Sequence, residues 1–183
     1  MTNGAHVSPI NTERLCLREF RLTDLGSMHA YASREDVTQY LMWGPNDAQA
    51  SEDQLATFIE VQSETPRLVY ELALTLKGDE RTIGALCLYL NEDRQSAELG
   101  FVLHPDFWGQ GLVTEASAAF AAWGFDWLGL GHIWATCDTR NQASVRVLQK
   151  IGMLREAILR GVRETPDGLM DQFRYGLAKP PPT

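Results

Sequence analysis

The sequence predicts a mixed α/β (α+β) domain in which helices pack against one central sheet. Several short segments alternate apolar and polar residues, which is typical of strands. Other segments place apolar residues three or four positions apart, which is typical of amphipathic helices. Between them, Ser96 to Thr114 reads as a strand, a glycine-containing loop and a helix start, and the rest of the chain is organised around this stretch.

The first half of the chain predicts three strands and three helical segments. A flexible leader (1–11) comes first. The elements that follow are a strand (13–20), a helix (23–33), a short helical piece (37–43), a helix from Ser51 that ends before Thr65-Pro66, and the two strands of a hairpin (68–76 and 82–90). Thr23 occupies the expected N-cap of the first helix. Ser51 begins an S-x-x-Q pattern, which is typical of a capping box and predicts that the next helix starts there.

The second half predicts strands that alternate with helices. They are a strand (97–103), a helix after the glycine loop that ends at 129–131, a strand (132–137), a helix capped by Asn141 and ended by Gly152, a strand pair (154–159 and 170–177) with a turn through 166–168, and a Pro-rich tail (179–183). Phe120, Trp123 and Trp127 share one face of the long helix, so we expect them to pack against the sheet. Residues 12–178 are expected to form one domain.

The glycine loop predicts an anion site. Gly109 and Gly111 precede a helix, and a helix N-terminus presents unpaired N–H groups that favour phosphate. The third glycine of a dinucleotide fingerprint is absent, because Thr114 stands in its place, and no Walker motif occurs. A Rossmann oxidoreductase is therefore a disfavoured alternative.

Composition narrows the function classes. The net charge of −8 argues against a nucleic-acid surface and is compatible with a cationic substrate. No apolar run is long enough to predict a membrane span, and the first residues lack a secretory pattern. Cys16, Cys87 and Cys137 are odd in number and far apart, which favours free thiols in a reducing cytoplasm. No cluster of His and Cys predicts a metal site, so none is expected.

The motifs together resemble one family. WGQGLVTEA after a strand, the run Asn141-Gln142-Ala143-Ser144 and the run Lys150-Ile151-Gly152-Met153 resemble the GNAT superfamily of acetyl-CoA-dependent N-acetyltransferases, and within it the Rim-type acetyltransferases of ribosomal-protein N-termini. The resemblance covers nearly the whole chain. It implies a mixed sheet of about seven strands flanked by about four helices, as is usual for that fold. It also implies that strand 97–103 and the strand from His132 splay apart around coenzyme A.

The resemblance implies which residues hold acetyl-CoA, the expected co-substrate. Backbone groups of the strand would bind the acetyl carbonyl and the pantetheine arm, the loop would bind the pyrophosphate, and Asn141 would bind the arm as well as cap its helix. The residues so implied are Phe101, Val102, Leu103, Trp108, Gly109, Gln110, Gly111, Leu112, Val113, Thr114 and Asn141. Val113 departs from the small residue usual at its position, so we expect it to crowd the phosphates slightly.

Two residues are candidates for catalysis. Glu98 is a carboxylate in an otherwise apolar strand, where its pKa can be raised, so it is the candidate general base. The alternative is that Glu98 faces solvent. The tyrosine that many family members use as an acid is Leu148 here, which leaves Ser144 as the candidate acid, with helix capping as its alternative role.

The sequence thus predicts a cytoplasmic N-acetyltransferase that works by direct attack in a ternary complex. The first acceptor hypothesis is a protein N-terminal α-amine, and the second is a small amine such as a polyamine, an amino acid or a drug. A non-catalytic acyl-CoA-binding module and a homodimer stay open. The resemblance implies that the acceptor site lies near Tyr40 to Pro45, with Trp43 as a lining residue, and near the turn from Thr165 to Gly168.

Overall fold

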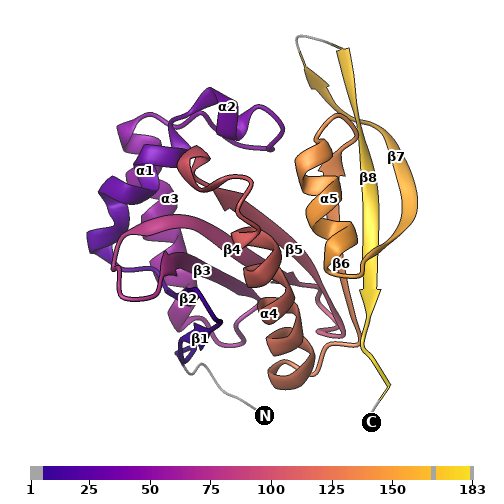
Figure 1. Ribbon diagram of the computed structural model, residues 1–183, viewed down its shortest axis with the longest axis horizontal. Helices are drawn as coiled ribbons and strands as arrows, with labels where there is room; N and C mark the ends of the chain where they lie inside the picture. Colours follow the sequence, from indigo (N-terminus) through magenta and orange to yellow (C-terminus); the bar gives the residue numbers. More distant parts are fainter. Residues whose placement is uncertain (1–5, 166–167, 182–183) are drawn as a thin grey trace.

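A computed structural model describes residues 6–165 and 168–181 as one mixed sheet with helices on both faces (Figure 1). The strand order is β1-β2-β3-β4-β5-β6-β8-β7, and every neighbouring pair among the described residues is antiparallel except β5 and β6. The strands are β1 Ile10–Asn11, β2 Leu15–Glu19, β3 Val69–Leu76, β4 Thr82–Leu90, β5 Ser96–Leu103, β6 His132–Asp138, β7 Leu154–Thr165 and β8 Gly168–Ala178.

The helices divide between the two faces of the sheet. They are α1 Leu25–Ala32, α2 Glu35–Thr38, α3 Ala48–Glu60, α4 Leu112–Trp127 and α5 Gln142–Lys150, with 3-10 turns at Leu22–Asp24, Val61–Ser63 and Pro105–Phe107. The larger core joins the sheet to α4 through side chains such as Leu86 and Phe120. The smaller core joins the other face to α1 and α3 through Met28 and Leu55. The sequence therefore predicts the fold class correctly.

The first helix starts differently from the expectation. Thr23 lies inside the 3-10 turn, and α1 begins two residues later. The carboxylate of Asp24 organises this turn: it accepts a hydrogen bond of 2.8 Å from the backbone N–H of Arg21 and two of 2.8 Å from the guanidinium of Arg18. Because this pair is buried, it fixes the turn against β2.

The capping box predicted at Ser51 is wrong. The helix α3 begins at Ala48, where Asp47 accepts the capping hydrogen bond from the N–H of Ala50. Ser51 is buried one turn later, and its Oγ lies 2.8 Å from Nδ1 of His29 on α1. An aspartate at the N-cap satisfies the helix start equally well, which frees the serine for the contact between the helices.

Three other boundaries differ. Part of the predicted leader is packed, because Ile10–Asn11 pairs with β2 and the N–H of Val7 donates to Glu19; residues 1–5 lie outside the described part. The short helix is α2, not 37–43. The strand β7 continues well beyond Leu159, and Pro166 and Asp167 of the expected turn also lie outside the described residues.

The aromatic residues of α4 differ in their burial. Phe120 is fully buried as predicted, whereas Trp127 is 68% exposed and not part of the core, because it is the last residue of α4. Among the helices of the described residues, none combines the length and the apolar character needed to cross a membrane.

Candidate functional site

The strands β5 and β6 separate partway along their length. They pair in parallel only at three positions, from Ser96↔His132 to Glu98↔Trp134. Beyond Glu98, β5 continues with β4 as far as Leu103, and β6 continues with β8 as far as Asp138. The splay predicted for these two strands is therefore confirmed, and it leaves one edge of β5 unpaired.

Alternation along β5 decides which backbone groups face the gap. The N–H of His104 donates to the carbonyl of Ile83 on β4, so the even-numbered residues of β5 pair with β4. The odd-numbered Phe101 and Leu103 therefore present their backbone groups to the gap. The groups of Val102 face β4 instead, and the expectation that they bind the cofactor is not supported by the register.

The glycine loop presents its N–H groups as predicted. Gly109 and Gly111 both have φ of +75°, a conformation that favours glycine. The first backbone bond of α4 runs from the N–H of Glu115 to the carbonyl of Gly111, so the N–H groups of Leu112 to Thr114 precede it and lack an intrahelical acceptor. These groups can bind an anion at the N-terminus of α4.

Two side chains of the loop bond to backbone carbonyls that precede it. The indole N–H of Trp108 donates to the carbonyl of Leu103 at 2.8 Å, which ties the loop to the end of β5. Gln110 donates to the carbonyl of Asp106. Val113 is buried in the core beneath α4, so the expectation that it crowds a phosphate is wrong.

A second set of residues braces the loop from the turn between β1 and β2. Glu115 accepts hydrogen bonds from the Thr12 hydroxyl and from the backbone and side chain of Arg14. Arg14 also donates to the carbonyl of Gln110 at 3.0 Å. Burial alone would raise the pKa of Glu115, but these hydrogen bonds outweigh it and lower the pKa to about 2. Sequence reasoning gave Glu115 no role, because its partners lie about a hundred positions away.

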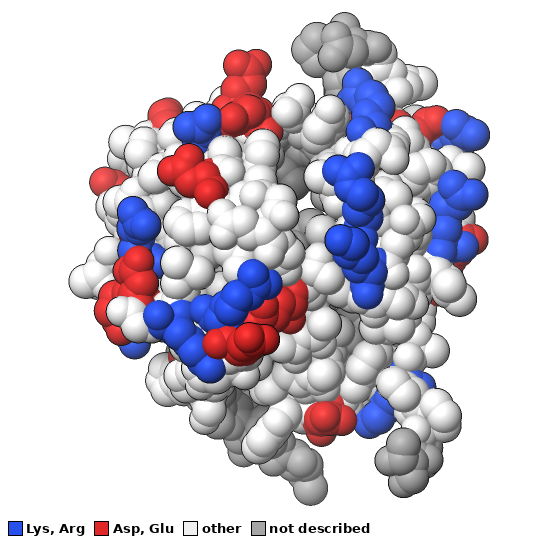
Figure 2. Space-filling view, viewed as in Figure 1, with Lys and Arg blue, Asp and Glu red and all other residues white. Residues whose placement is uncertain are grey.

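Positive side chains gather beside the gap. Figure 2 shows Lys and Arg over α5, which carries the exposed Arg146 and Lys150. At the start of α5, Oδ1 of Asn141 accepts from the N–H of Ser144 at 3.0 Å, so Asn141 is the helix cap, as predicted. Ser144 is therefore not the cap, and its hydroxyl bonds no other residue of the described chain.

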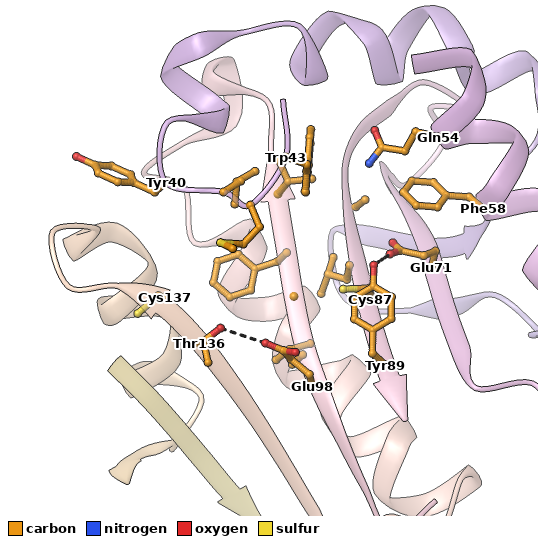
Figure 3. A pocket seen from close by; sticks show the side chains of 18 of the residues that line it. Tyr40, Trp43, Gln54, Phe58, Glu71, Cys87, Tyr89, Glu98, Thr136 and Cys137 are labelled. Atoms are coloured by element: carbon orange, nitrogen blue, oxygen red, sulfur yellow. Dashed lines mark hydrogen bonds between the residues drawn. The ribbon is translucent and has the colours of Figure 1, made fainter. Parts of the chain in front are cut away.

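Glu98 lies where the two strands part. Its side chain enters a cavity on the α1 and α3 face of the sheet, and the hydroxyl of Thr136 on β6 donates to it at 3.1 Å (Figure 3). Burial raises the pKa of Glu98, against the opposing effects of Thr136 and Arg174. Glu98 is half-buried, not solvent-facing, and a carboxylate of this kind can accept a proton.

The cavity has a volume of about 370 Å³. Its walls are largely apolar and come in part from α1, α3 and the segment after α2, which contributes Tyr40 to Trp43. The strand β8 contributes Gln172. Of the described residues that line the cavity, two are carboxylates, Glu98 and Glu71, and none is Lys, Arg or His.

Sequence reasoning missed Glu71 and Tyr89. Glu71 on β3 is only 4% exposed and accepts a hydrogen bond from the hydroxyl of Tyr89 on β4 (Figure 3). Burial raises the pKa of Glu71 to about 7, although the bond from Tyr89 opposes this. The signal was a single carboxylate in the buried strand segment VYELALTL, and it has the same form as the signal that identified Glu98.

No group of three or more His, Cys, Asp or Glu side chains placed to hold a metal ion occurs among the described residues. The site therefore combines a glycine loop with free N–H groups, an open strand edge and a cavity with two carboxylates, with Glu98 between the edge and the cavity.

Comparisons with known proteins agree with this geometry. Residues 14–154 match the Acetyltransferase (GNAT) domain family. The uncharacterized N-acetyltransferase YnaD of Bacillus subtilis is 28% identical over 168 residues, which cover 92% of this chain and 95% of that protein.

Solved structures show the same fold. An acetyltransferase of the GNAT family from Bacillus anthracis superposes with a TM-score of 0.83 at 26% identity, covering 93% of this chain and 98% of that one. A ribosomal L7/L12 alpha-N-protein acetyltransferase, RimL, solved with coenzyme A, superposes with a TM-score of 0.81 at 16% identity over 93% and 98% of the two chains, a likeness of fold alone. The family match removes the Rossmann alternative, and the chain belongs to the GNAT acetyltransferases.

Proposed function

We propose that the protein transfers an acetyl group from acetyl-CoA to a primary amine, with Glu98 as the general base. One observation carries this proposal: Glu98 stands at the last paired position of β5 and β6, so it borders both the open strand edge and the acidic cavity. A thioester bound along the edge and an amine bound in the cavity would meet beside a carboxylate of raised pKa.

The chain offers a fitting set of groups for acetyl-CoA. The N–H groups of Gly109 to Thr114 and the positive end of α4 suit the pyrophosphate, and glycine at the two left-handed positions leaves the loop backbone open. The backbone of Phe101 and the N–H of Leu103 suit the pantetheine arm and the acetyl carbonyl, whereas the Leu103 carbonyl already accepts from Trp108. Asn141 adds an amide near the same gap, and the basic side chains on α5 suit the remaining phosphate.

The proposed reaction needs few protein groups. The amine nitrogen forms a bond to the thioester carbon, its proton passes to Glu98 directly or through water, and the carbon–sulfur bond breaks with release of the thiolate. An N–H of the β5 edge facing the developing oxyanion would lower the barrier by about 3 kcal/mol. We propose Ser144 as the group that returns a proton to the thiolate, because its hydroxyl bonds no other described residue.

The cavity favours a small amine as acceptor over a protein N-terminus. A space of about 370 Å³ with two carboxylates and no cationic side chain among its described lining residues suits a compact cation. A protein N-terminal α-amine, the first hypothesis from the sequence, is the second candidate, and the likeness of fold to the L7/L12 acetyltransferase supports it.

We also propose a cytoplasmic location and a homodimer. The free thiols Cys87 and Cys137 are buried, which fits a reducing compartment, and the dimer follows from the resemblance to the family. Cell fractionation and sedimentation measure the two directly.

The test is the release of thiol from acetyl-CoA with an acceptor panel of diamines, monoamines, amino acids, aminoglycosides and short ribosomal-protein N-terminal peptides. We expect release that depends on a small amine and falls as the pH drops below the pKa of Glu98. Glu98→Gln should lower kcat by about a hundredfold or more. The matched control is Glu92→Gln, an exposed carboxylate away from the site. Tight acetyl-CoA binding without release for any acceptor would favour the non-catalytic binding module.

A further inference from the structure

We propose that Glu71 and Tyr89 form a second cation subsite in the acceptor cavity, so that the preferred acceptor carries two amino groups. One amino group is acetylated beside Glu98, and the other is held as an ammonium by Glu71. The inference rests on the proposed function and adds to it the chemical class of the acceptor and the residues that select it.

The sheet places the two carboxylates on one face at a defined spacing. Glu71 lies opposite Cys87, and Tyr89, two residues further along β4, lies opposite Glu98. With strands about 4.8 Å apart and a rise of about 3.4 Å per residue, the Cα atoms of Glu71 and Glu98 are about 12 Å apart. Figure 3 shows the ring of Tyr89 between the two carboxylates, with its hydroxyl toward Glu71.

The carboxylate of Glu71 has capacity for another hydrogen-bond donor. An ionised carboxylate accepts about four hydrogen bonds. Among the described residues, only the hydroxyl of Tyr89 donates to Glu71, and no Arg or Lys lines the cavity. An ammonium ion supplies both the opposite charge and the missing donors, which makes it the ligand chemistry that best completes this site.

The floor of the cavity between the two carboxylates carries no other charged side chain among the described lining residues. Cys87 and Gly100 occupy it, on the same face as Glu71 and Glu98. A Cβ atom at Gly100 would lie 2.6 Å from Sγ of Cys87, so glycine at this position lets the thiol pack directly against β5. Trp43 and Phe58 form part of the opposite wall (Figure 3). A short aliphatic spacer between two amino groups fits such a passage.

The subsite implies a dependence on pH. An ammonium binds the ionised form of Glu71, whose pKa is about 7 in the free protein, so affinity should rise as the pH increases through that range. The titratable groups that face Glu71 are Tyr31 from α1, Cys87 and Tyr89 from β4, and Glu98 from β5. None of them is cationic. Burial raises the pKa values of the Cys87 thiol and the Tyr89 hydroxyl, so both groups stay neutral.

The experiment compares diamines with monoamines of equal size by titration calorimetry on the full chain saturated with coenzyme A. The probes are tetramethylenediamine and hexamethylenediamine, against pentylamine and heptylamine. At pH 8 we expect at least one diamine to bind the wild type about tenfold or more tightly than its monoamine, the usual size of one charge-assisted hydrogen bond. Glu71→Gln should bring this ratio close to one, whereas the exposed control Glu60→Gln should keep it.

Tyr89→Phe gives a second readout that a purely structural role would not move. The bond from Tyr89 lowers the pKa of Glu71, so its loss should shift the pH dependence of diamine binding upward. A wild-type ratio near one, or a ratio that Glu71→Gln leaves unchanged, overturns the subsite.

Thiol release from acetyl-CoA with the same amines separates the two proposals. Equal release with diamines and monoamines overturns the subsite and leaves the transferase intact. If diamine binding depends on Glu71 but no amine causes thiol release, the subsite proposal is supported and the transferase proposal is wrong.

Discussion

The carboxylates that brace the framework and those that line the cavity differ in their partners. Asp24 accepts two hydrogen bonds from Arg18, Glu19 accepts one from Arg67, and Glu115 is paired with Arg14. In the cavity, Glu71 accepts a bond from the phenol of Tyr89, and Glu98 accepts one from the hydroxyl of Thr136. Neither cavity carboxylate has an ion pair within the described chain.

The pKa values of Asp24 and Glu71 shift in opposite directions because their hydrogen-bond partners differ. Burial raises the pKa of Asp24, but the hydrogen bonds from Arg18 outweigh it and the net pKa is lowered. Burial also raises the pKa of Glu71, and there the single bond from Tyr89 is too weak to reverse it. A framework carboxylate is stabilised by a cationic partner inside the chain, whereas for a cavity carboxylate we propose that a cationic ligand supplies that partner.

The largest effect should come from removing a framework carboxylate. Asp24→Asn leaves the guanidinium of Arg18 buried without its counter-ion, so we expect a loss of about 3–5 kcal/mol in the free energy of unfolding at pH 7. Urea denaturation measures it. A loss below about 1 kcal/mol, the size typical of an exposed pair, would show that the Arg18–Asp24 pair does not stabilise the fold as a buried pair.

Replacing the cavity carboxylate Glu71 by its amide should stabilise the fold rather than destabilise it. The folded-state pKa of Glu71 is about 7 and its unfolded-state pKa is 4.5, so its contribution to stability is present below pH 4.5 and is lost as the pH rises through 7. Glu71→Gln removes this loss and should stabilise the fold by about 3 kcal/mol at pH 8, and by little at pH 4.5. Urea denaturation at both pH values tests this, and destabilisation at pH 8 would show that Glu71 is a framework residue.

Loss of the Glu115 contacts that brace the glycine loop should weaken acetyl-CoA binding more than it lowers the stability of the fold. Glu115→Gln weakens the contacts to Thr12 and Arg14 that hold the loop, so we expect the Kd for acetyl-CoA to rise about fivefold to tenfold. Fluorescence titration measures it, with Glu92→Gln as the exposed control. An unchanged Kd would mean that the loop keeps its shape without this brace.

The smallest effect should come from Ser144. A thiolate is a stable leaving group, so Ser144→Ala should lower kcat by only about threefold to tenfold. The proton-return step is the one affected, and the loss should be greatest where that step limits the rate. Steady-state kinetics across pH tests this, and a loss as large as that of Glu98→Gln would give Ser144 a larger role than the one proposed.

Local patterns predicted much of this molecule. The loop around Gly109 and Gly111 and the cap at Asn141 depend on neighbours in sequence and were readable from it. The half-buried position of Glu98 was one of two alternatives that the sequence left open. The start of α3 was not, because Asp47 and Ser51 both suit an N-cap and only the packing of Ser51 against His29 decides between them. Glu71 and Tyr89 were missed because they lie eighteen positions apart and meet only through the pairing of β3 with β4.

Glu71 lacks a cationic partner among the described residues, and we propose that it gains one from the acceptor. The most direct test is a carbon-13 NMR titration of glutamate-labelled protein, with the Glu71 carboxyl assigned by its absence in Glu71→Gln. We expect a pKa near 7 in the free protein and a fall of about one unit or more with a saturating diamine. A pKa at the ordinary value of 4.5 without ligand, or one that no amine lowers, would contradict the account.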